Sequence, residues 1–316
     1  MIAFLFRRLG HGLFVMLLAS TVTFAIMLAA PGGPSLLADP KLSGDERTEI
    51  VQRLGLDQPP AVQYTRWITR AVHGDFGRSF LYQTPALETI GSRLPATLLL
   101  AGTSLLITLV IGIPTGMLAA ARRGSRFDRL VIAASGVASS VPVFWSGLML
   151  VLLLAVWARW LPAGGALTEG GGDVGLVDRL RHLILPALVL ASTGCAEIVR
   201  YTRSAAATTL ALPFVQTARA RGLSGPRILW RHALRYAMST VVNVIGLQLP
   251  RLVGGAAVTE TVFAWPGIGR LGVEAALGRD YPLVMAVTLL VSAGVLLASL
   301  LADVAQMMID PRLRTA

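Results

Sequence analysis

The residues that could do catalytic chemistry in this chain are few and lie far apart. Nucleophilic catalysis needs a nucleophile with a base within hydrogen-bond reach. Ser146 is a candidate nucleophile inside an apolar segment. The histidines that could serve as its base all lie at the ends of apolar segments or outside them, at positions 11, 73, 182 and 232. The pattern therefore does not predict an enzyme.

The sequence does not predict a metal or nucleotide site either. The His, Cys and carboxylate residues are not clustered at metal-ligand spacing. A standard phosphate-binding loop has a lysine followed by Ser or Thr, whereas the single lysine, Lys41, is followed by Leu42. We interpret the single cysteine, Cys195, as a small buried side chain. We expect no cofactor in this chain. Because it lacks a phosphate-binding loop, ATP and Mg would have to be bound by partner chains if the protein works in an ATP-driven process.

Charged side chains do concentrate in residues 204–236, where arginines occur without a single acidic residue. Pro213 fits the first turn of a short helix, and Gly222 fits the left-handed position that ends it. Ser224 is predicted to cap a second helix, with Pro226 in its first turn, that continues into the next apolar segment. Taken alone, the charges also fit an amphipathic helix that binds anionic membrane lipid.

Long apolar helices must position these residues. The chain has 54% apolar and 14% charged residues, and its mean hydropathy is +0.66. This composition is outside the range of soluble domains. Crossing a membrane takes roughly 20 apolar residues in a helix. Six segments qualify, near residues 9–30, 95–121, 130–157, 183–203, 237–258 and 283–306. We predict an all-α polytopic membrane protein in which residues 1–316 form one transmembrane domain.

The first apolar segment is predicted to be a retained helix. Arg7 and Arg8 precede it, as basic residues precede the apolar part of a signal peptide. The apolar run is about 22 residues long, however, and no small-residue cleavage signal closes it.

The placement of arginines predicts the orientation. The N-terminus, residues 122–130, residues 200–236 and the C-terminal tail hold 15 arginines against two acidic residues. The opposite segments, 31–94, 158–182 and 259–282, hold 12 basic against 13 acidic residues. Basic residues stay on the cytoplasmic side, so both termini are predicted to be cytoplasmic. The net charge of +11 is spread over these turns, which does not predict a nucleic-acid partner.

Residues 31–94 are too long for a turn and predict a small extracytoplasmic helical cap. Ser43 fits the start of a first helix with a capping box, and Gly55 fits its end. A second helix is predicted over residues 60–74. Its apolar face, which suits packing against the membrane domain or docking of a partner, comprises Tyr64, Trp67, Ile68 and Ala71. Residues 158–182 are predicted to be a flexible connector.

The segment 259–282 combines aromatic, proline and glycine residues at the end of the fifth apolar segment. This mixture suits an irregular or re-entrant loop that lines a cavity. It also suits an aromatic anchor at the membrane interface. The candidate cavity-lining residues are Glu260, Phe263, Pro266, Gly267 and Gly269.

Arg251 lies inside the fifth apolar segment, where facing lipid would cost roughly 2.5 to 3.5 kcal/mol. We therefore expect its side chain to face a subunit interface or a wet cavity. Glu260 and Glu197 are the candidate partners. A structural ion pair and a contact with a substrate both fit this position.

The residues from Thr217 to Leu223 resemble the cytoplasmic signature loop of the membrane subunits of ABC importers. They are most similar to the B-type subunit of the dipeptide/oligopeptide/nickel permease family. Ala218 and Gly222 match the general motif, whereas Thr217 replaces its acidic residue and Arg219 its second alanine. The resemblance runs nearly from end to end. Further matching motifs lie at residues 7–9, 54–59, 74–77, 94–98, 254–255, 260–269, 279–282 and 310–312.

The resemblance implies the type I ABC importer permease fold, with six transmembrane helices, the extracytoplasmic cap and a cytoplasmic coupling helix within 204–236. It implies that coupling to the ATPase involves Phe214, Thr217, Ala218, Arg219, Gly222 and Leu223. The candidates for the translocation pathway are then Arg251, Glu260, Phe263, Pro266, Gly267 and Gly269.

The resemblance also implies partners and a location. The partners would be a second homologous permease subunit in a heterodimer, two ABC ATPase subunits and an extracytoplasmic substrate-binding protein. The location would be a bacterial or archaeal cytoplasmic membrane. Di- or oligopeptides are the expected substrates, with nickel or a metallophore as the alternative. A stand-alone secondary transporter is the alternative from another class.

Overall fold

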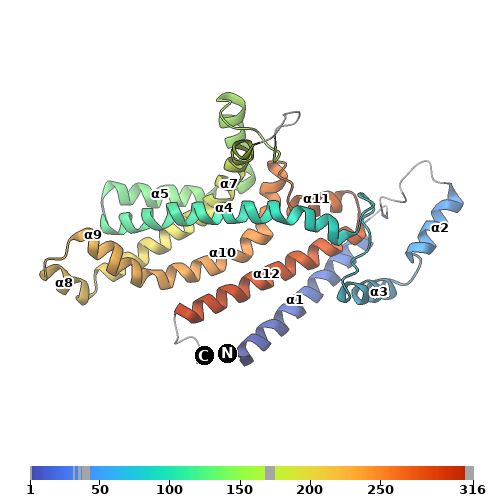
Figure 1. The fold of residues 1–316 in the computed structure, drawn as a ribbon, viewed down its shortest axis with the longest axis horizontal. Coiled ribbons are helices and arrows are strands. Elements are labelled where there is room, and N and C mark those ends of the chain that lie inside the picture. Colours follow the sequence, from blue (N-terminus) through green and yellow to red (C-terminus); the bar gives the residue numbers. More distant parts are fainter. Residues whose placement is uncertain (1, 31–32, 35–36, 38–42, 168–174, 310–316) are drawn as a thin grey trace. The chain divides into compact units, whose positions relative to one another are not determined.

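The computed structural model describes residues 2–30, 33–34, 37, 43–167 and 175–309. These residues are mostly helical (Figure 1), and the described ranges contain no strand beyond an isolated bridge between Arg78 and Pro85. The first helices are α1 (Ile2–Ala29), α2 (Gly44–Leu54), α3 (Pro60–Val72), α4 (Ala86–Ala121), α5 (Arg126–Ser140) and α6 (Val143–Leu150). They are followed by η2 (Val151–Trp157), α7 (Leu176–Leu210), α8 (Pro213–Ala220), α9 (Gly225–Arg227), η3 (Ile228–Ala233), α10 (Leu234–Val262), α11 (Ile268–Leu277) and α12 (Tyr281–Ile309). The predicted all-α class is confirmed.

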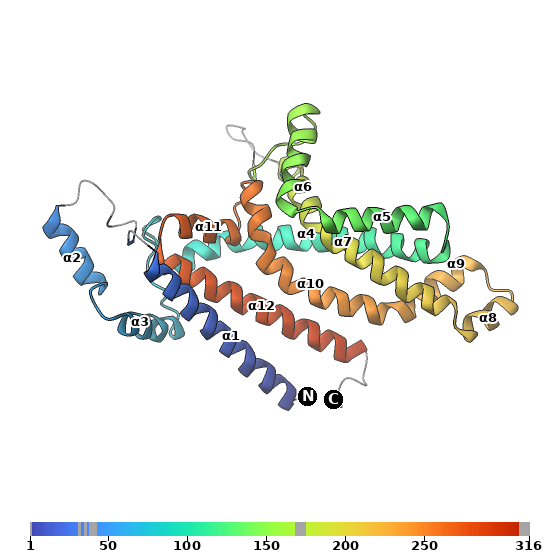
Figure 2. The same ribbon diagram turned by 180° about the vertical axis from the view of Figure 1, so that it is seen from behind.

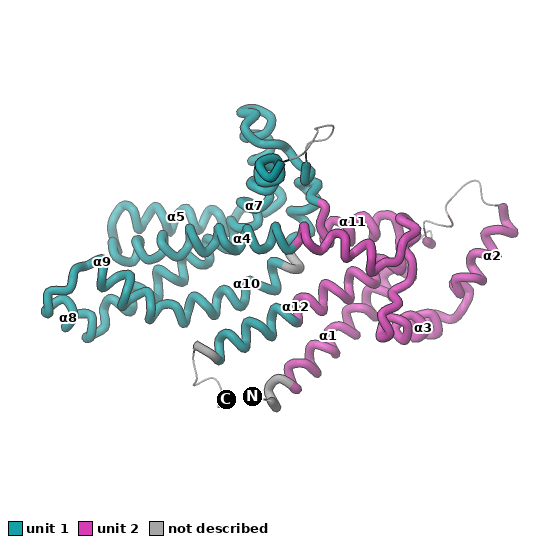
Figure 3. The backbone as a smooth tube through the Cα atoms, viewed as in Figure 1, with its two compact units in different colours: residues 1, 98–265, 297–316 teal, residues 2–97, 266–296 magenta. Residues whose placement is uncertain are grey.

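Two compact units make up the chain (Figure 3). Unit 1 comprises Leu98–Trp265 and Leu297–Ala316 together with Met1, and unit 2 comprises Ile2–Thr97 and Pro266–Leu296. The boundary crosses α4 and α12, so each of these helices contributes to both units.

The described residues contain four candidate membrane spans, or six if each bent pair of helices is counted as one span. Four are continuous helices, Phe6–Ala29, Ala86–Ala121, Leu176–Leu210 and Tyr281–Met307. Two more are bent pairs of helices. Arg126–Ser140 meets Val143–Trp157 at 103°, and Gly225–Leu252 meets Ala256–Val262 at 53°. Counted in this way, the spans match the six apolar segments of the sequence.

The segment near 130–157 is not the straight span that its apolar run predicts. Val141 is extended, with φ −82° and ψ 127°, and Pro142 follows it. Proline disfavours the helical conformation of the residue before it and lacks the N–H that would continue the helix. The chain therefore turns sharply between α5 and α6.

The helices α2 and α3 lie within the predicted cap. Ser43 and Glu46 form the expected capping box, with the Ser43 amide 2.8 Å from a Glu46 carboxylate oxygen and the Glu46 amide 3.2 Å from the Ser43 hydroxyl. The hydrogen bond from the Ser43 backbone holds the pKa of Glu46 below its usual range. Gly55 ends α2 in the left-handed conformation, with φ +67°.

Unit 2 has its core where α3, α4, α11 and α12 meet. Ala71, Ile90, Leu271 and Leu283 are buried there, with Trp67 packed against them. The apolar face predicted for the second cap helix therefore packs within its own unit. Tyr64 extends this face to α1, because its hydroxyl lies 2.7 Å from that of Ser20.

Asp280 ties the segment before α4 to the start of α12 in unit 2. Its carboxylate accepts hydrogen bonds from the Ser79 hydroxyl at 2.5 Å and the Leu81 amide at 3.0 Å. It also accepts a bond from the Leu283 amide at 3.2 Å, which satisfies one of the free amides of the first turn of α12. A fully buried carboxylate is tolerated here because these donors replace its water.

In unit 1, α7 packs against both α5 and α10. Ile198 of α7 is buried with Val241 and Val244 of α10. A second cluster joins the end of α4 to α7 and η3 through Met117, Ala206 and Leu229. The polar segment 204–236 thus starts and ends on helices that share one core.

Candidate functional site

The short helix α8 starts and ends where the sequence predicts. Pro213 is its first residue, and Gly222 follows the C-cap residue Arg221 with φ +79°. The Gly222 amide donates to the Arg219 carbonyl at 2.9 Å, and the Leu223 amide donates to the Ala218 carbonyl at 3.2 Å. This pair of bonds is the Schellman arrangement, which needs a left-handed residue at the position of Gly222.

One face of α8 is held by unit 1 and the other is open. Val215 is fully buried, and the ring of Phe214 lies 6.3 Å from that of Tyr236 on α10. Thr217, Arg219 and Gly222 are exposed, and Ala218 and Leu223 are half-buried. Figure 1 and Figure 2 both place α8 at the far end of α7 and α10. The candidate coupling residues thus form a surface on an anchored helix.

The chain after α8 departs in one detail from the expected cap. Ser224 occupies the N-cap position of α9, but its hydroxyl makes no capping hydrogen bond. Pro226 is the second residue of the helix and has no N–H, so it removes one of the two amides that an N-cap hydroxyl normally binds. As predicted, the helix then continues, through the π-helical segment η3, into α10.

A cavity of about 380 Å³ lies between α8 and the surrounding helix ends. Its lining includes Leu118 of α4 and Arg122 just after that helix, Arg219 of α8, Pro226 of α9 and Trp230 of η3. Beside this space, α8 contacts η3, and Val215 of α8 is fully buried.

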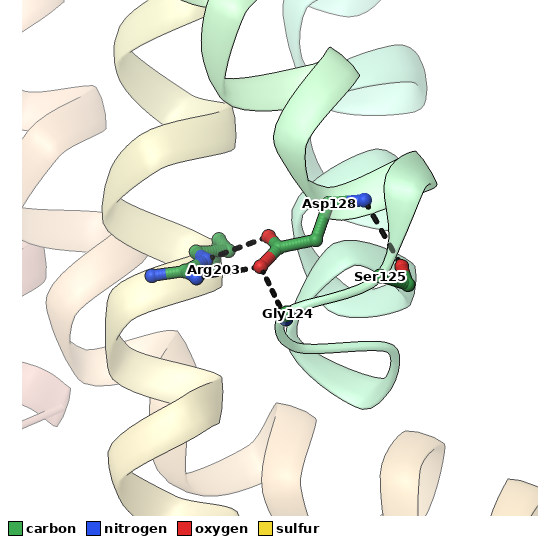
Figure 4. Close-up of polar contacts among 4 residues, drawn as sticks. All are labelled: Gly124, Ser125, Asp128 and Arg203. Carbon is green, nitrogen blue, oxygen red and sulfur yellow. Dashed lines mark hydrogen bonds and ion pairs between the residues drawn. The ribbon is translucent and has the colours of Figure 1, made fainter.

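A buried ion pair, which the sequence analysis did not identify, braces α7 before it reaches α8 (Figure 4). Arg203 Nε lies 3.0 Å from Asp128 Oδ1, and Arg203 Nη2 lies 2.8 Å from Oδ2. Oδ2 also accepts the Gly124 amide at 2.9 Å, and the Asp128 amide donates to the Ser125 hydroxyl at 3.2 Å. Asp128 is 2% exposed. The available signal was a single acidic residue among the four arginines of residues 122–130.

The structure pairs Arg251 with Glu197 of α7 rather than with Glu260. Arg251 Nη1 lies 2.9 Å from Glu197 Oε1 and 3.3 Å from Oε2. The Arg251 side chain is 68% exposed and that of Glu197 is 30% exposed. One turn earlier on α10, Gln248 donates to the Gly194 carbonyl at 3.0 Å. The two helices are thus joined by polar contacts inside candidate spans.

The residues around Phe263 divide between the two units. In unit 1, Phe263 is 1% exposed and packs on Leu185 and Val189 of α7, and its carbonyl accepts the Gly165 amide at 2.8 Å. Glu260 is fully buried. Neither side chain reaches the surface of the unit in this conformation, so lining a pathway would require this segment to move.

Pro266, Gly267 and Gly269 belong to unit 2. Gly267 is the N-cap residue of α11, a helix that the sequence analysis did not predict. The Ile268 amide, the first of that helix, donates to the Thr97 hydroxyl of α4 at 2.8 Å. The irregular part of the segment is therefore short and is followed at once by an anchored helix.

Metal-ligating residues do not converge in the described part of the chain. Groups of three or more His, Cys, Asp or Glu side chains that could hold a metal ion are absent from these residues.

Known families match nearly the whole chain. A family model described as a binding-protein-dependent transport system inner membrane component matches residues 112–315. A model of the N-terminal part of such membrane components matches residues 1–101.

Individual relatives match over their full length. The oligopeptide transport system permease protein AppB of Bacillus subtilis is 40% identical, with 99% of each chain covered. The dipeptide transport system permease protein DppB of Escherichia coli is 36% identical, again with 99% of each covered. A chain from the inward facing MetNI methionine ABC transporter has a TM-score of 0.58 at 21% identity. That match covers 71% of this chain and 97% of the other and concerns the fold alone.

Proposed function

The chain belongs to the family of inner membrane components of binding-protein-dependent transport systems, and from this membership we propose that it imports di- or oligopeptides as one permease subunit of an ABC importer. It is a multi-pass membrane protein, and its family works in complexes with ATPase and substrate-binding partners. Peptide import rests on the full-length identity to permeases named for oligopeptides and dipeptides.

The observation that carries the mechanism is α8, a helix anchored on one face and open on the other. We propose that the open face, with Thr217, Arg219 and Gly222, docks on a cytoplasmic ABC ATPase. ATP and Mg would be bound by that subunit. Closure of the ATPases would push on α8, which contacts η3, and the core that η3 shares with α4 and α7 would transmit the push into the membrane helices.

The assembly that fits this role contains a second homologous permease, two ATPases and an extracytoplasmic binding protein. A heterodimer of permeases is proposed from the family resemblance. Both termini and α8 would lie in the cytoplasm, because the arginine excess of residues 122–130 and 200–236 favours that side. The helices α2 and α3 would then lie outside, where the binding protein docks.

The translocation pathway is proposed to follow the exposed side of α10, where Arg251 lies. Glu260, Phe263, Pro266, Gly267 and Gly269 would border it at the outer end of that helix. Because Glu260 and Phe263 are buried here, we expect them to become accessible only when the transporter opens outward.

Purification of the tagged chain from its native membrane tests the assembly. We expect a second permease and ABC ATPases to co-purify. The reconstituted complex, supplied with its binding protein, should take up peptide only with ATP. Uptake driven by an ion gradient without ATP would instead indicate a secondary transporter. Mass spectrometry of the ligand released from the binding protein distinguishes a peptide from nickel or a metallophore.

A further inference from the structure

Two neighbouring helices of unit 1 share an exposed face, with mostly polar residues, that their packing does not use. The α7 positions that are exposed or half-buried include Glu197, Tyr201, Ser204 and Thr208, which recur at three- and four-residue spacing. Residues at this spacing lie on one side of a helix. The exposed residues of α10 include Asn243, Leu247 and Arg251. The apolar contacts between the helices, such as Ile198 with Val241, lie on another side.

The charged members of this face lie inside the apolar segments of the candidate spans. Glu197 is 14 residues after the start and 6 before the end of the apolar segment 183–203, which corresponds to about 21 Å and 9 Å of helix, and Arg251 has 14 and 7 residues of the segment 237–258 on its two sides. Arg251 and Glu197 expose 68% and 30% of their side chains. Charged residues inside such segments are rare and face protein or water rather than lipid. The face therefore borders a wet space or another subunit.

The ion pair leaves half of the guanidinium available. Only Nη1 of Arg251 contacts Glu197, at 2.9 and 3.3 Å from its two oxygens. Within the described residues, Nε and Nη2 of Arg251 make no hydrogen bond. A free Nε–Nη2 edge presents two parallel N–H donors, the geometry that binds one carboxylate through both of its oxygens. Glu197 binds Nη1, on the other side of the guanidinium, and so fixes the direction in which Nε and Nη2 point.

We propose that Arg251 binds the C-terminal carboxylate of the transported peptide during its passage and that Glu197 is the positioning residue that orients the guanidinium. This inference rests on the proposed function, since it assumes that peptides pass along this face. A terminal carboxylate is shared by all unmodified peptides, so one arginine can serve substrates with different side chains. A temporary site of this kind replaces some of the water that the carboxylate loses on entering the membrane.

The test uses the complete complex in liposomes, with ATP and the binding protein. The probes are trialanine and its C-terminal amide, which differ only in the carboxylate. We expect Arg251→Gln to slow trialanine uptake on the order of tenfold, because losing a charge-assisted hydrogen bond is worth at least 1.4 kcal/mol. Uptake of the amide should not change. Glu197→Gln keeps an oxygen acceptor and should slow trialanine less, whereas Glu197→Ala should approach Arg251→Gln.

A matched control is Arg200→Gln on the same helix as Glu197. Arg200 bonds to Ser139 at 2.7 Å and to the Ser135 carbonyl at 3.1 Å. It thus has a structural role, and its loss should leave the ratio of trialanine to amide uptake unchanged. An equal effect of Arg251→Gln on both probes would overturn the proposal.

The charge-exchanged variant, Arg251→Glu with Glu197→Arg, separates the proposal from a purely structural ion pair. A structural pair should tolerate the exchange, and near-normal trialanine uptake would therefore reject the proposal. A carboxylate site should not recover, although the complex assembles and hydrolyses ATP. If the binding protein does not bind the amide, trialanine uptake by this variant alone decides between a carboxylate site and a structural ion pair. Failure of the wild-type complex to take up any peptide would instead reject the proposed function.

Discussion

At the scale of single residues, the ion pair between Asp128 and Arg203 illustrates how much the surroundings of a charge matter. The Asp128 carboxylate is buried and takes three hydrogen bonds from the guanidinium and the Gly124 amide. Removing one partner of such a pair leaves a buried charge and costs roughly 3 to 5 kcal/mol. The pair between Arg270 and Glu274, each about one third exposed, should be worth only about 0 to 1 kcal/mol.

We therefore expect Arg203→Gln to lower the melting temperature of the purified complex by several degrees or to prevent assembly. Glu274→Gln, the matched control, should change it little. Thermal unfolding in detergent measures both. Equal shifts in the two variants would mean that the Asp128 pair contributes no more than a surface pair does.

A second residue-scale prediction concerns the turn after α8. A side chain at Gly222 would meet no other atom within 4 Å, so the only obstacle to substitution is its φ of +79°. A β-branched residue is strained there, whereas asparagine tolerates it. Gly222→Val should abolish peptide-stimulated ATP hydrolysis, and Gly222→Asn should retain most of it. Normal coupling in a correctly inserted Gly222→Val complex would argue against a coupling role for α8.

At the scale of elements, capping residues in the sequence predicted where helices begin and end, but the apolar segments did not predict where a helix is interrupted. Ser43, Pro213 and Gly222 each mark the boundary that the structure has, because capping depends on neighbouring residues. Pro142 and Pro186 are both prolines in apolar segments, yet the chain bends by 103° at the first and continues as a helix through the second. Surrounding packing decides between these outcomes, and a single sequence does not contain it.

The helix α11 was missed for a related reason. Its N-cap residue is Gly267, which has no side chain to bind the free amides. The acceptor is the hydroxyl of Thr97, 171 positions earlier in the chain. A cap supplied from so far away leaves no local pattern, so the sequence suggested only an irregular loop.

An element-scale prediction concerns the contact between the loop after η2 and the end of α10. A Cβ at Gly164 would lie 2.6 Å from the carbonyl oxygen of Phe263, which is backbone and cannot move aside easily. Gly164→Ala should cost about 1 to 3 kcal/mol, the usual range for overpacking, and lower the melting temperature. Gly136→Ala, at an open helical position, should not lower it. The same thermal assay checks both, and an unchanged Gly164→Ala complex would mean that this contact is loose.

At the scale of the whole molecule, composition and the lengths of the apolar segments predicted the all-α membrane class and the spans, because lipid solvation acts on every residue of a span. The residues that join the spans were less predictable. Asp128 and Arg203 are 75 positions apart, and choosing Glu197 over Glu260 for Arg251 required the packing of α7 on α10. Charge patterns therefore identify which residues need partners, and the fold selects the partners.

The proposed orientation gives a prediction for the intact cell. In a Cys195→Ala background, a cysteine at Thr48 of α2 should react with a membrane-impermeant thiol reagent, and a cysteine at Ser224 should not until the cells are permeabilised. Both positions are exposed, so burial does not confuse the comparison. The reverse labelling pattern would place α8 outside the cell and invert the topology.

The close approach of α4 to α7 limits how unit 1 can deform. A methyl group at Gly112 would lie 2.8 Å from Ile198, and one at Gly116 would lie 2.7 Å from the Val199 carbonyl. The two helices are therefore closely packed at these glycines, which leaves little room for either helix to slide or roll against the other. A displacement of α8 would therefore move α4 and α7 together as one rigid pair of helices. If α8 has its proposed coupling role, any bending during transport would then have to occur elsewhere, and the break between α5 and α6, where Val141 is extended and Pro142 follows, is the place we propose for it.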